Sequence, residues 1–390
     1  MTGDLSGRIG HYVTTTSQGE TTRAYVPNPL PPNPPLDLSR LMGLIALADQ
    51  SLGRLDGMAS VLPSTNLLVF MFVRKEALLS SQIEGTQSSL SDLLLFEDNE
   101  VPLAPLDDVQ EVSNYIAAMD HGLKRLAGGF PLSLRLIREV HEALMAKGRG
   151  SSKQPGEFRR TQNWIGGTRL GNARFVPPPP DRVMDCLGDL ETFLHDRSLY
   201  PPVIRAALAH LQFETIHPFL DGNGRLGRLL ITLLLCEEKV LSQPILYLSL
   251  YLKANRARYY ELLQEVREKG VWETWIEFFL EGIIHSAQQG VTTAQRLLAL
   301  FGEDYAKIAL LGRPARSALL LHAELQQRPM LVVPSAAKRL KLSLPTLQKS
   351  AEHLLAAGII EETTGKRRNR VYRYTRYLRI LDEGTEPIAP

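Results

Sequence analysis

Apolar residues recur at helical spacing along most of the chain from Leu36 onward. Residues 67–96 show this spacing over about thirty positions. It returns in residues 132–148, 180–196 and 201–217, each bounded by Pro, Gly or Ser, as expected of amphipathic helices and their ends. The pattern therefore predicts a mainly α-helical protein.

Two segments depart from the helical pattern. Residues 1–35 are polar and then proline-rich, which predicts an extended arm with polyproline character. The arm is either a tether on the surface or a binding segment. Two short β-like runs around a Gly-rich turn predict a small β-hairpin from Gln162 to Val176, ended by prolines. An exposed hairpin on a helical core suggests a flap.

The pattern changes again after residue 310. Three short helices and then two strands around a charged turn, 364–370, are expected in the order of a winged helix-turn-helix. Ser343 is the expected N-cap of the helix in the recognition position. Residues 310–382 hold 14 Lys and Arg against five Asp and Glu, although the whole chain carries only +2. This module is expected either to bind DNA through phosphates or to dock a protein or a second copy.

These patterns divide the chain into five parts: an arm (1–35), a helical N-terminal domain (36–105), a core (106–300), a winged helix-turn-helix (310–382) and a tail (383–390).

The composition indicates the compartment. The chain has 390 residues, 44% hydrophobic and 22% charged, which is ordinary globular usage. Cys186 and Cys236 lie in apolar helical patterns, so reduced buried thiols are expected instead of a disulfide. The longest apolar runs, 67–73 and 229–236, are shorter than the roughly 18 residues of a membrane span. We therefore expect a cytoplasmic protein without an export signal or membrane anchor.

One stretch, HPFLDGNGRLGR at 217–228, concentrates chemically useful residues. His217 precedes Pro218, which favours extended backbone, so its ring is expected to point freely into a cleft. Gly222, Asn223 and Gly224 come just before an apolar helix, so their N–H groups should form an anion site at its N-terminus.

The charged residues of this stretch suit a nucleoside triphosphate. Arg225 and Arg228 lie three apart on one helix, and two guanidinium groups there suit a polyphosphate. Asp221, beside the bound phosphates, is a ligand for Mg²⁺, which takes one or two protein oxygens together with phosphate oxygens. His217 is then the general base that takes a proton from an attacking hydroxyl.

The stretch matches H-P-F-x-D-G-N-G-R-x-x-R at every fixed position and so resembles the Fic (filamentation induced by cAMP) family. The similarity extends over most of the chain, to members with a Fic N-terminal domain and a C-terminal winged helix. It is carried also by the segments PGEFRRTQNWIGG, RFVPPPP, RAALAHLQFETIHPF, YYELLQEVREKGVWETWIEFFLEG and SSQIEG. A Fic-fold helical core with a hairpin flap is therefore expected.

The resemblance implies transfer of AMP from ATP to a Ser, Thr or Tyr hydroxyl of a protein target or of the enzyme itself. It implies that His217 is the base and Asp221 the Mg²⁺ ligand. The flap would bind the backbone of the target by strand addition. Tyr259 and Tyr260 would lie near the adenine, unless they only pack in the core. The residues implied to bind ATP are Gly222, Asn223, Gly224, Arg225, Leu226, Gly227, Arg228, Tyr259 and Tyr260, and those of the flap are Ile165, Gly166, Gly167 and Thr168.

The segment SSQIEG resembles the inhibitory pattern S/T-x-x-x-E-G/N of the family, with Ser80, Glu84 and Gly85 at its fixed positions. Gly85 is also expected to end the helix in which the pattern lies. We expect Glu84 to form a salt bridge with Arg228, which would occupy the group meant for the γ-phosphate. The sequence therefore predicts an autoinhibited ground state. In some relatives the corresponding glutamate also supports removal of AMP.

Other functions are open at this point. The chain could be a DNA-binding regulator whose core only senses nucleotide, although such a sensor has no need of His217. It could also use another donor, since relatives transfer UMP, phosphocholine or phosphate. Retention of Gly222, Asn223 and Gly224 favours transfer of a nucleoside monophosphate. A homodimer is possible.

Overall fold

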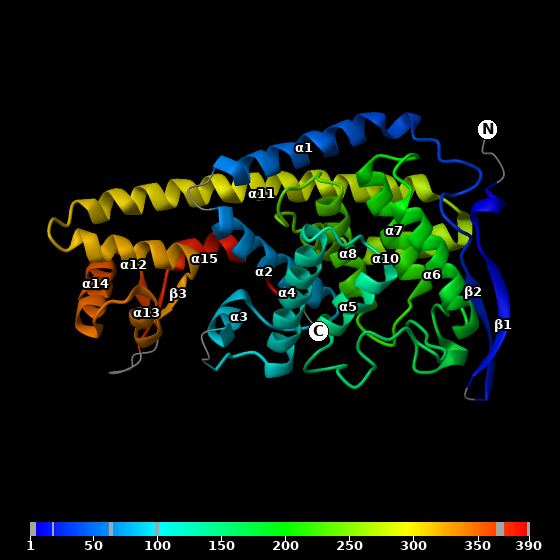
Figure 1. Ribbon diagram of the computed structural model, residues 1–390, viewed down its shortest axis with the longest axis horizontal. Helices are drawn as coiled ribbons and strands as arrows, with labels where there is room; N and C mark the ends of the chain where they lie inside the picture. Colours follow the sequence, from blue (N-terminus) through cyan, green and yellow to red (C-terminus); the bar gives the residue numbers. More distant parts are fainter. Residues whose placement is uncertain (1–4, 18, 62–64, 98–100, 364–369, 388–390) are drawn as a thin grey trace.

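The structure is a computed structural model that describes residues 5–17, 19–61, 65–97, 101–363 and 370–387. It is elongated and consists mostly of helices (Figure 1). The longest helix, α11 (Trp272–Ala309), runs along much of the molecule, and α1 (Met42–Val61) lies beside it. The mainly α-helical fold predicted from the sequence is confirmed.

A β-hairpin replaces the extended arm predicted for residues 1–35. Strands β1 (His11–Ser17) and β2 (Glu20–Val26) pair antiparallel, with His11 opposite Val26. Both strands are rich in Thr, Val and Tyr, which fit the pleated surface of a strand, and this preference outweighs the polar character of the segment. The proline-rich residues follow the hairpin.

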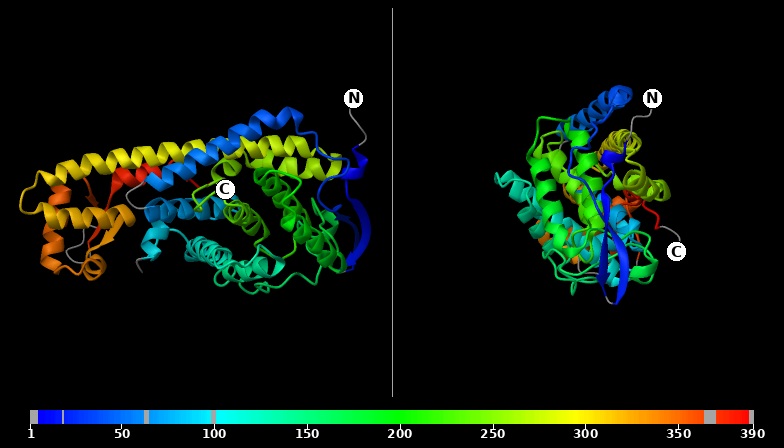
Figure 2. Two further views of the ribbon diagram at one scale, coloured as in Figure 1. Left: turned by 45° about the horizontal axis from the view of Figure 1, so that its top comes forward. Right: turned by 90° about the vertical axis from the view of Figure 1, so that its right-hand side faces the viewer.

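The N-terminal hairpin lies against the segment predicted to be the flap, at the end of the molecule opposite the C-terminal module (Figure 2). Glu20 accepts hydrogen bonds from Arg169 Nη1 and from the Gly171 N–H, both at 2.5 Å. Tyr25 N–H donates to the Val176 carbonyl at 2.9 Å. These contacts hold residues 162–176 from outside.

The flap itself is a loop and not the two-stranded hairpin predicted from the sequence. A single antiparallel bridge joins Ile165 to Phe175. Gly166 and Gly167 both have positive φ, at 69° and 75°, which ends strand geometry directly after Ile165. Asn172 Oδ1 then accepts the N–H groups of Thr168 and Arg169 at 3.0 and 2.9 Å, so a side chain replaces the ladder.

The core of the fold surrounds two buried helices, α7 and α8. Every residue of α7 after Pro202 is buried, as expected of a helix that is apolar on nearly all faces. The helices of the core are α4 (Leu106–Ala127), α5 (Leu134–Leu144), α6 (Pro180–His195), α7 (Pro202–Ile216), α8 (Asn223–Glu237), α9 (Ser249–Ala254) and α10 (Arg256–Lys269), followed by α11. Short 3-10 turns lie at Ser6–Arg8, Ser39–Leu41 and Leu170–Asn172.

Helices α2 (Thr65–Ile83) and α3 (Leu90–Glu97) complete the N-terminal helical part with α1. Gly85, with φ of 104°, follows the end of α2, as predicted. Helix α2 packs on α4 and α9, so its C-terminal end points into the core.

The C-terminal module contains α12 (Ala315–Gln327), β3 (Met330–Val332), α13 (Val333–Leu340), α14 (Leu344–Ala356), β4 (Glu361–Glu362), β5 (Val371–Arg373) and α15 (Thr375–Asp382). The strands form an antiparallel sheet in the order β3-β5-β4. Ser343 Oγ accepts from the Thr346 N–H at 3.3 Å and caps α14, as predicted. Of the predicted charged turn, 364–369 lie outside the described residues. Sequence periodicity missed β3 and α15.

After α15 the chain returns to the middle of the molecule and meets α2 (Figure 1). Lys75 Nζ donates to the Glu383 carbonyl at 2.8 Å, and Gln82 Nε2 donates to the Thr385 carbonyl at 2.8 Å. Lys253 Nζ donates to Gln82 Oε1 at 2.7 Å and also to the Glu386 carbonyl. We call residues 383–386 the tail clasp, because they hold the helix that carries Ser80.

Within the described parts of the chain, the helices are all too short or too polar to cross a membrane.

Candidate functional site

The loop between α7 and α8 carries His217 as the C-cap of α7. Its backbone is left-handed, with φ of 49° and ψ of 60°, and not extended as predicted from Pro218. Such a conformation is unfavourable for a non-glycine residue. It is held here because Arg159 Nε and Asn163 Nδ2 both donate to the His217 carbonyl, at 2.9 and 3.4 Å.

The next residues form a tight turn that begins α8. Asn223 Oδ1 accepts from the Phe219 N–H and Asn223 Nδ2 donates to the Phe219 carbonyl, each at 2.9 Å. The side chain of Asn223 therefore shapes the loop. Gly222 is the N-cap with φ of 78°. The first N–H groups of α8 lack partners within the helix and remain an anion site.

A cavity of about 390 Å³ opens at this turn. Three of its lining residues, His217, Gly224 and Arg228, come from the motif. Glu84 enters from the end of α2, and Tyr260 comes from α10. The flap segment contributes Ile165 and Gly166. The structure thus brings the motif, the flap and the inhibitory segment to one cavity.

Arg228 lines this cavity and is bound by residues at the end of α2 and in the turn that follows it. Its Nη2 donates to Glu84 Oε1 at 2.6 Å and to the Ser80 carbonyl at 2.9 Å, and its Nε donates to Ser80 Oγ at 2.9 Å. The side chain of Arg228 is 1% exposed and that of Glu84 is 37% exposed. The salt bridge between Glu84 and Arg228 expected from the sequence is present.

Burial alone would lower the pKa of Arg228 and raise the pKa of Glu84. Their mutual attraction outweighs burial, so the pKa of Arg228 is raised and the pKa of Glu84 is lowered. The Glu84 carboxylate also lies directly over Gly224, where an added Cβ would collide with Oε1. Glu84 therefore occupies both parts of the anion site, the start of α8 and the Arg228 guanidinium.

Arg225 is placed differently from Arg228 and does not line the cavity. Its Nη1 lies 3.1 Å from Glu111 Oε1 of α4, and both side chains are almost completely buried. Leu226 is in the hydrophobic core, and Gly227 faces α7, where an added Cβ would lie 2.6 Å from Glu214 Oε1. None of these three residues lines the cavity, and their ATP contacts stay predictions.

Asp221 fits the role of a single carboxylate ligand for Mg²⁺. Its side chain is 41% exposed beside the start of α8, and its Oδ1 accepts from the Gly222 N–H at 2.6 Å. Among the described residues there is no group of three or more His, Cys, Asp or Glu that could hold a metal alone.

Burial, together with the charges of Arg159 and Arg267, lowers the pKa of His217 to about 3. The imidazole is therefore neutral at physiological pH and able to accept a proton. Its Nδ1 is 4.0 Å from Glu214 Oε2.

The two tyrosines of α10 have different surroundings. Tyr260 lines the cavity, and Arg256 lies over its ring at 5.4 Å. Tyr259 is completely buried, with its hydroxyl 2.9 Å from His210 Nε2, so it packs in the core and is not placed to contact adenine. Gly167 and Thr168 of the flap are exposed and do not line the cavity.

Sequence reasoning missed Glu214, Arg256 and Glu111. Arg256 Nε donates to the Ile83 carbonyl at 3.1 Å and so holds the end of α2. Glu111 gave no signal in the sequence, because it lies at one of the ordinary charged positions of an amphipathic helix. Glu214 had a signal, because it is the only acidic residue in the stretch 201–217.

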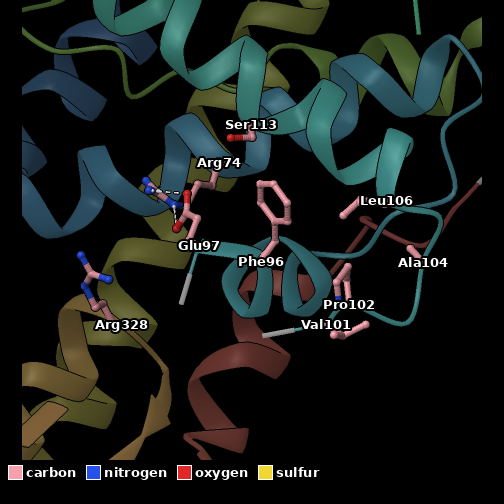
Figure 3. Close-up of a pocket in the computed structure, with 9 residues that line it drawn as sticks. All are labelled: Arg74, Phe96, Glu97, Val101, Pro102, Ala104, Leu106, Ser113 and Arg328. Carbon is pink, nitrogen blue, oxygen red and sulfur yellow. Dashed lines mark hydrogen bonds and ion pairs between the residues drawn. The ribbon is translucent and has the colours of Figure 1, made fainter. Parts of the chain in front are cut away.

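A larger cavity of about 870 Å³ lies elsewhere, between α3 and the start of α4 (Figure 3). Apolar residues such as Phe96 and Leu106 line it, and the salt bridge between Arg74 and Glu97 forms part of its wall. None of the predicted site residues is among the described residues that line it, so its size does not make it the active site.

Known proteins are similar to this chain in two parts of its sequence. Residues 42–124 match the Fic/DOC family N-terminal model, and residues 131–235 match the Fic/DOC family model. "Protein adenylyltransferase Fic" of Aedes aegypti is 31% identical over 191 residues, 48% of this chain and 35% of that protein. "Protein adenylyltransferase fic-1" of Caenorhabditis elegans is 37% identical over 164 residues, 40% of this chain and 30% of that protein. The chain thus spans about a third of the length of these relatives.

Two solved structures show the same fold. A Fic family protein from Desulfovibrio desulfuricans G20 has a TM-score of 0.57 at 22% identity, covering 87% of this chain and 97% of that chain. A Fic domain containing signaling protein from Bacteroides thetaiotaomicron VPI-5482 has a TM-score of 0.52 at 19% identity, covering 64% of this chain and 97% of that chain.

Proposed function

Since the chain belongs to the Fic/DOC family, we propose that it is a protein adenylyltransferase. It transfers AMP from ATP to a Ser, Thr or Tyr hydroxyl of a protein target, or of the enzyme itself, and releases pyrophosphate. The observation that carries this proposal is the meeting of a neutral His217, the start of α8 and Arg228 in one cavity. The adenylyltransferase names of the relatives support it.

In this reaction His217 takes the proton of the target hydroxyl. The hydroxyl oxygen forms a bond to the α-phosphorus of ATP while the bond from that phosphorus to the bridging oxygen breaks, and pyrophosphate leaves. The N–H groups at the start of α8 and the Arg228 guanidinium hold the phosphates, so catalysis rests on positioning and charge. Mg²⁺ bound at Asp221 would neutralise the developing negative charge on the phosphates.

Glu84 makes the described form an inhibited one. Its carboxylate occupies the two positions that the terminal phosphate needs, the start of α8 and Nη2 of Arg228. Two negative groups would compete for the same guanidinium. ATP therefore binds without the alignment that transfer requires, until the end of α2 moves away.

The flap is proposed to bind the target backbone. Ile165 and Gly166 line the cavity, and Ile165 already exchanges backbone hydrogen bonds with Phe175 at 2.8 and 3.1 Å. A target segment beside Gly166 and Gly167 would place its hydroxyl near His217. Backbone binding leaves the choice of target to other surfaces.

We further propose that residues 310–382 form a winged helix-turn-helix that binds DNA. The basic excess of the module and the exposed positions Lys341, Thr346 and Lys349 on and before α14 support this. A gel-shift titration with duplex DNA at low salt tests it, since phosphate contacts weaken as salt rises. No shift at low salt would leave docking of a protein, or of a second copy, as the role.

A cytoplasmic location is proposed as well. Cys186 and Cys236 are unpaired, and burial raises their pKa to about 11 and about 12. Inert thiols of this kind suit a reducing compartment.

Mass spectrometry of the whole chain incubated with Mg²⁺ and ATP tests the main proposal. Glu84→Gly is expected to gain the mass of AMP on itself, and Glu84→Gly with His217→Ala is expected to gain none. UTP in place of ATP identifies the donor. If neither ATP nor UTP adds mass to Glu84→Gly, alone or with candidate targets, the proposed transfer is wrong.

A further inference from the structure

Glu214 is a buried carboxylate and the only acidic residue of α7. It is 6% exposed, and its Oε1 has no hydrogen-bond partner among the described residues. Burying such a group without partners is unfavourable. The fold nevertheless makes room for it, because Gly227 of α8 has no side chain where the carboxylate lies.

Glu214 lies one helical turn before His217, and both line the cavity. Glu214 Oε2 is 4.0 Å from His217 Nδ1, and this Nδ1 has no hydrogen-bond partner among the described residues either. The backbone carbonyl of Glu214 also faces His217 and favours its protonated form. Nδ1 therefore points towards residue 214, which leaves Nε2 as the atom that can meet a substrate.

We propose that Glu214 is a positioning residue for His217. Its carboxylate holds the Nδ1–H of the imidazole and keeps the lone pair on Nε2, which takes the proton of the target hydroxyl. It also balances the positive charge that His217 gains with that proton. The inference rests on the proposed function, because it assumes that His217 is the general base.

The charges around His217 explain why such a partner is needed. The positive charges of Arg159 and Arg267 both disfavour the protonated form of His217. Without a nearby carboxylate, the protonated imidazole would be left in a buried positive site, which raises the barrier to proton transfer. The hydrogen bond requires only that the gap of 4.0 Å between Oε2 and Nδ1 closes by about 1 Å.

Glu214 also provides a pH signature. Its pKa is raised to about 7, mainly by burial and also by the charge of Glu84, against the opposing charges of Arg228 and Arg267. The carboxylate is ionised above this pH, so activity that depends on it falls as the pH falls through about 7. The titratable and charged groups that face the pair are Glu84 of the turn after α2, Arg159 of the loop before the flap, His210 of α7, Arg228 of α8, and Tyr259, Tyr260 and Arg267 of α10.

The test uses Glu214→Gln in the full chain carrying Glu84→Gly. Glutamine keeps the size of the side chain and removes its charge. We expect kcat for AMP transfer to fall about 10- to 100-fold, with the KM for ATP changed by less than about two-fold since Glu214 does not hold phosphate. In this background the step in kcat lies below about pH 7, because the raising effect of Glu84 on the pKa of Glu214 is removed, and Glu214→Gln is expected to abolish the step.

Glu76→Gln is the matched control. Glu76 of α2 is equally buried and its pKa is also raised to about 7, but its carboxylate accepts from Ser249 N and Oγ at 3.0 and 2.6 Å and does not face His217. We expect this variant to keep both kcat and the step. The proposal is overturned if Glu214→Gln keeps them too, or if Glu76→Gln loses the step.

A second measurement does not depend on turnover. The ¹⁵N chemical shifts of His217, assigned by comparison with His217→Ala, report which nitrogen carries the proton. We expect the Nδ1–H form in the wild-type chain at pH 8 and a mixture of both forms in Glu214→Gln. Equal populations in the two proteins would overturn the positioning role, whether or not Glu84→Gly transfers AMP. If the populations differ as expected but Glu84→Gly transfers no AMP, only the proposed function has failed.

Discussion

Arg225 and Arg228 lie one turn apart on α8, yet they belong to different parts of the molecule. Arg225 turns to Glu111 on α4, and that pair is closed off in the interior. Arg228 turns to the end of α2, where its partner Glu84 remains more than one-third exposed. Two identical side chains on one helix thus differ in whether the partner can leave. A buried partner makes a structural ion pair, and a partner at the surface makes a releasable one.

The difference predicts opposite rankings for stability and for activity. Arg225→Gln leaves the buried Glu111 with only the exposed Arg149 nearby, 3.5 Å from its Oε2, so the free energy of unfolding should fall by about 1 to 3 kcal/mol. Arg228→Gln should cost less, because Glu84 can turn to water. Urea unfolding of both variants measures this. An equal or larger loss for Arg228→Gln would mean that Glu84 is as firmly enclosed as Glu111.

The releasable pair should control activity. Glu84→Gly frees the Arg228 guanidinium, and a charge-assisted hydrogen bond of this kind corresponds to a roughly 10- to 100-fold increase in AMP incorporation. Glu111→Gln, which weakens the enclosed pair, should give no increase. Incorporation of labelled AMP from ATP compares the two variants. Activation by Glu111→Gln would contradict the assignment of Arg228 alone to the inhibited site.

ATP binding should follow the same division. Without the competing carboxylate, Glu84→Gly is expected to bind ATP roughly 5- to 10-fold more tightly than the wild type, since one like-charge conflict is removed. Isothermal titration with a non-hydrolysable ATP analogue measures both dissociation constants. Equal constants would mean that Glu84 disturbs only the alignment of the phosphates and not their binding.

The smallest effect is expected at the tail clasp. Lys253→Met removes the donor to Gln82 and to the Glu386 carbonyl while keeping the aliphatic stem. Losing contacts of this partly exposed kind should loosen α2 slightly and raise AMP incorporation about two- to three-fold. Lys269→Met, which removes an exposed pair with Glu265 on α10, serves as the control and should change nothing. An unchanged rate for Lys253→Met would separate the clasp from inhibition.

The sequence predicted the elements that depend on local pattern. Helical spacing identified the core helices, Gly85 marked the end of α2, and the motif gathered His217, Gly224 and Arg228 correctly at one turn. These features follow from periodicity, from the freedom of glycine and from short spacing along one chain segment.

The failures depend on partners distant in the chain. Spacing alone put Arg225 beside Arg228, because Glu111, which draws Arg225 away, lies over a hundred positions earlier. The extended backbone expected at His217 was overridden by Arg159, whose guanidinium binds the carbonyls of the loop. Tyr259 and Tyr260 could not be distinguished in the sequence, because adjacent tyrosines do not show which one faces the core. In the structure Tyr259 meets the buried His210, and Tyr260 lines the cavity.

The tail clasp joins the C-terminal module to Glu84 through a single helix. Lys75 and Gln82 of α2 hold the Glu383 and Thr385 carbonyls, and Arg228 holds Ser80 of that same helix. A ligand that binds the C-terminal module more tightly when the tail clasp is detached from α2 therefore also favours the release of α2. Thermodynamic reciprocity then requires ATP to increase the affinity of the module for that ligand by the same factor by which the ligand increases the affinity for ATP.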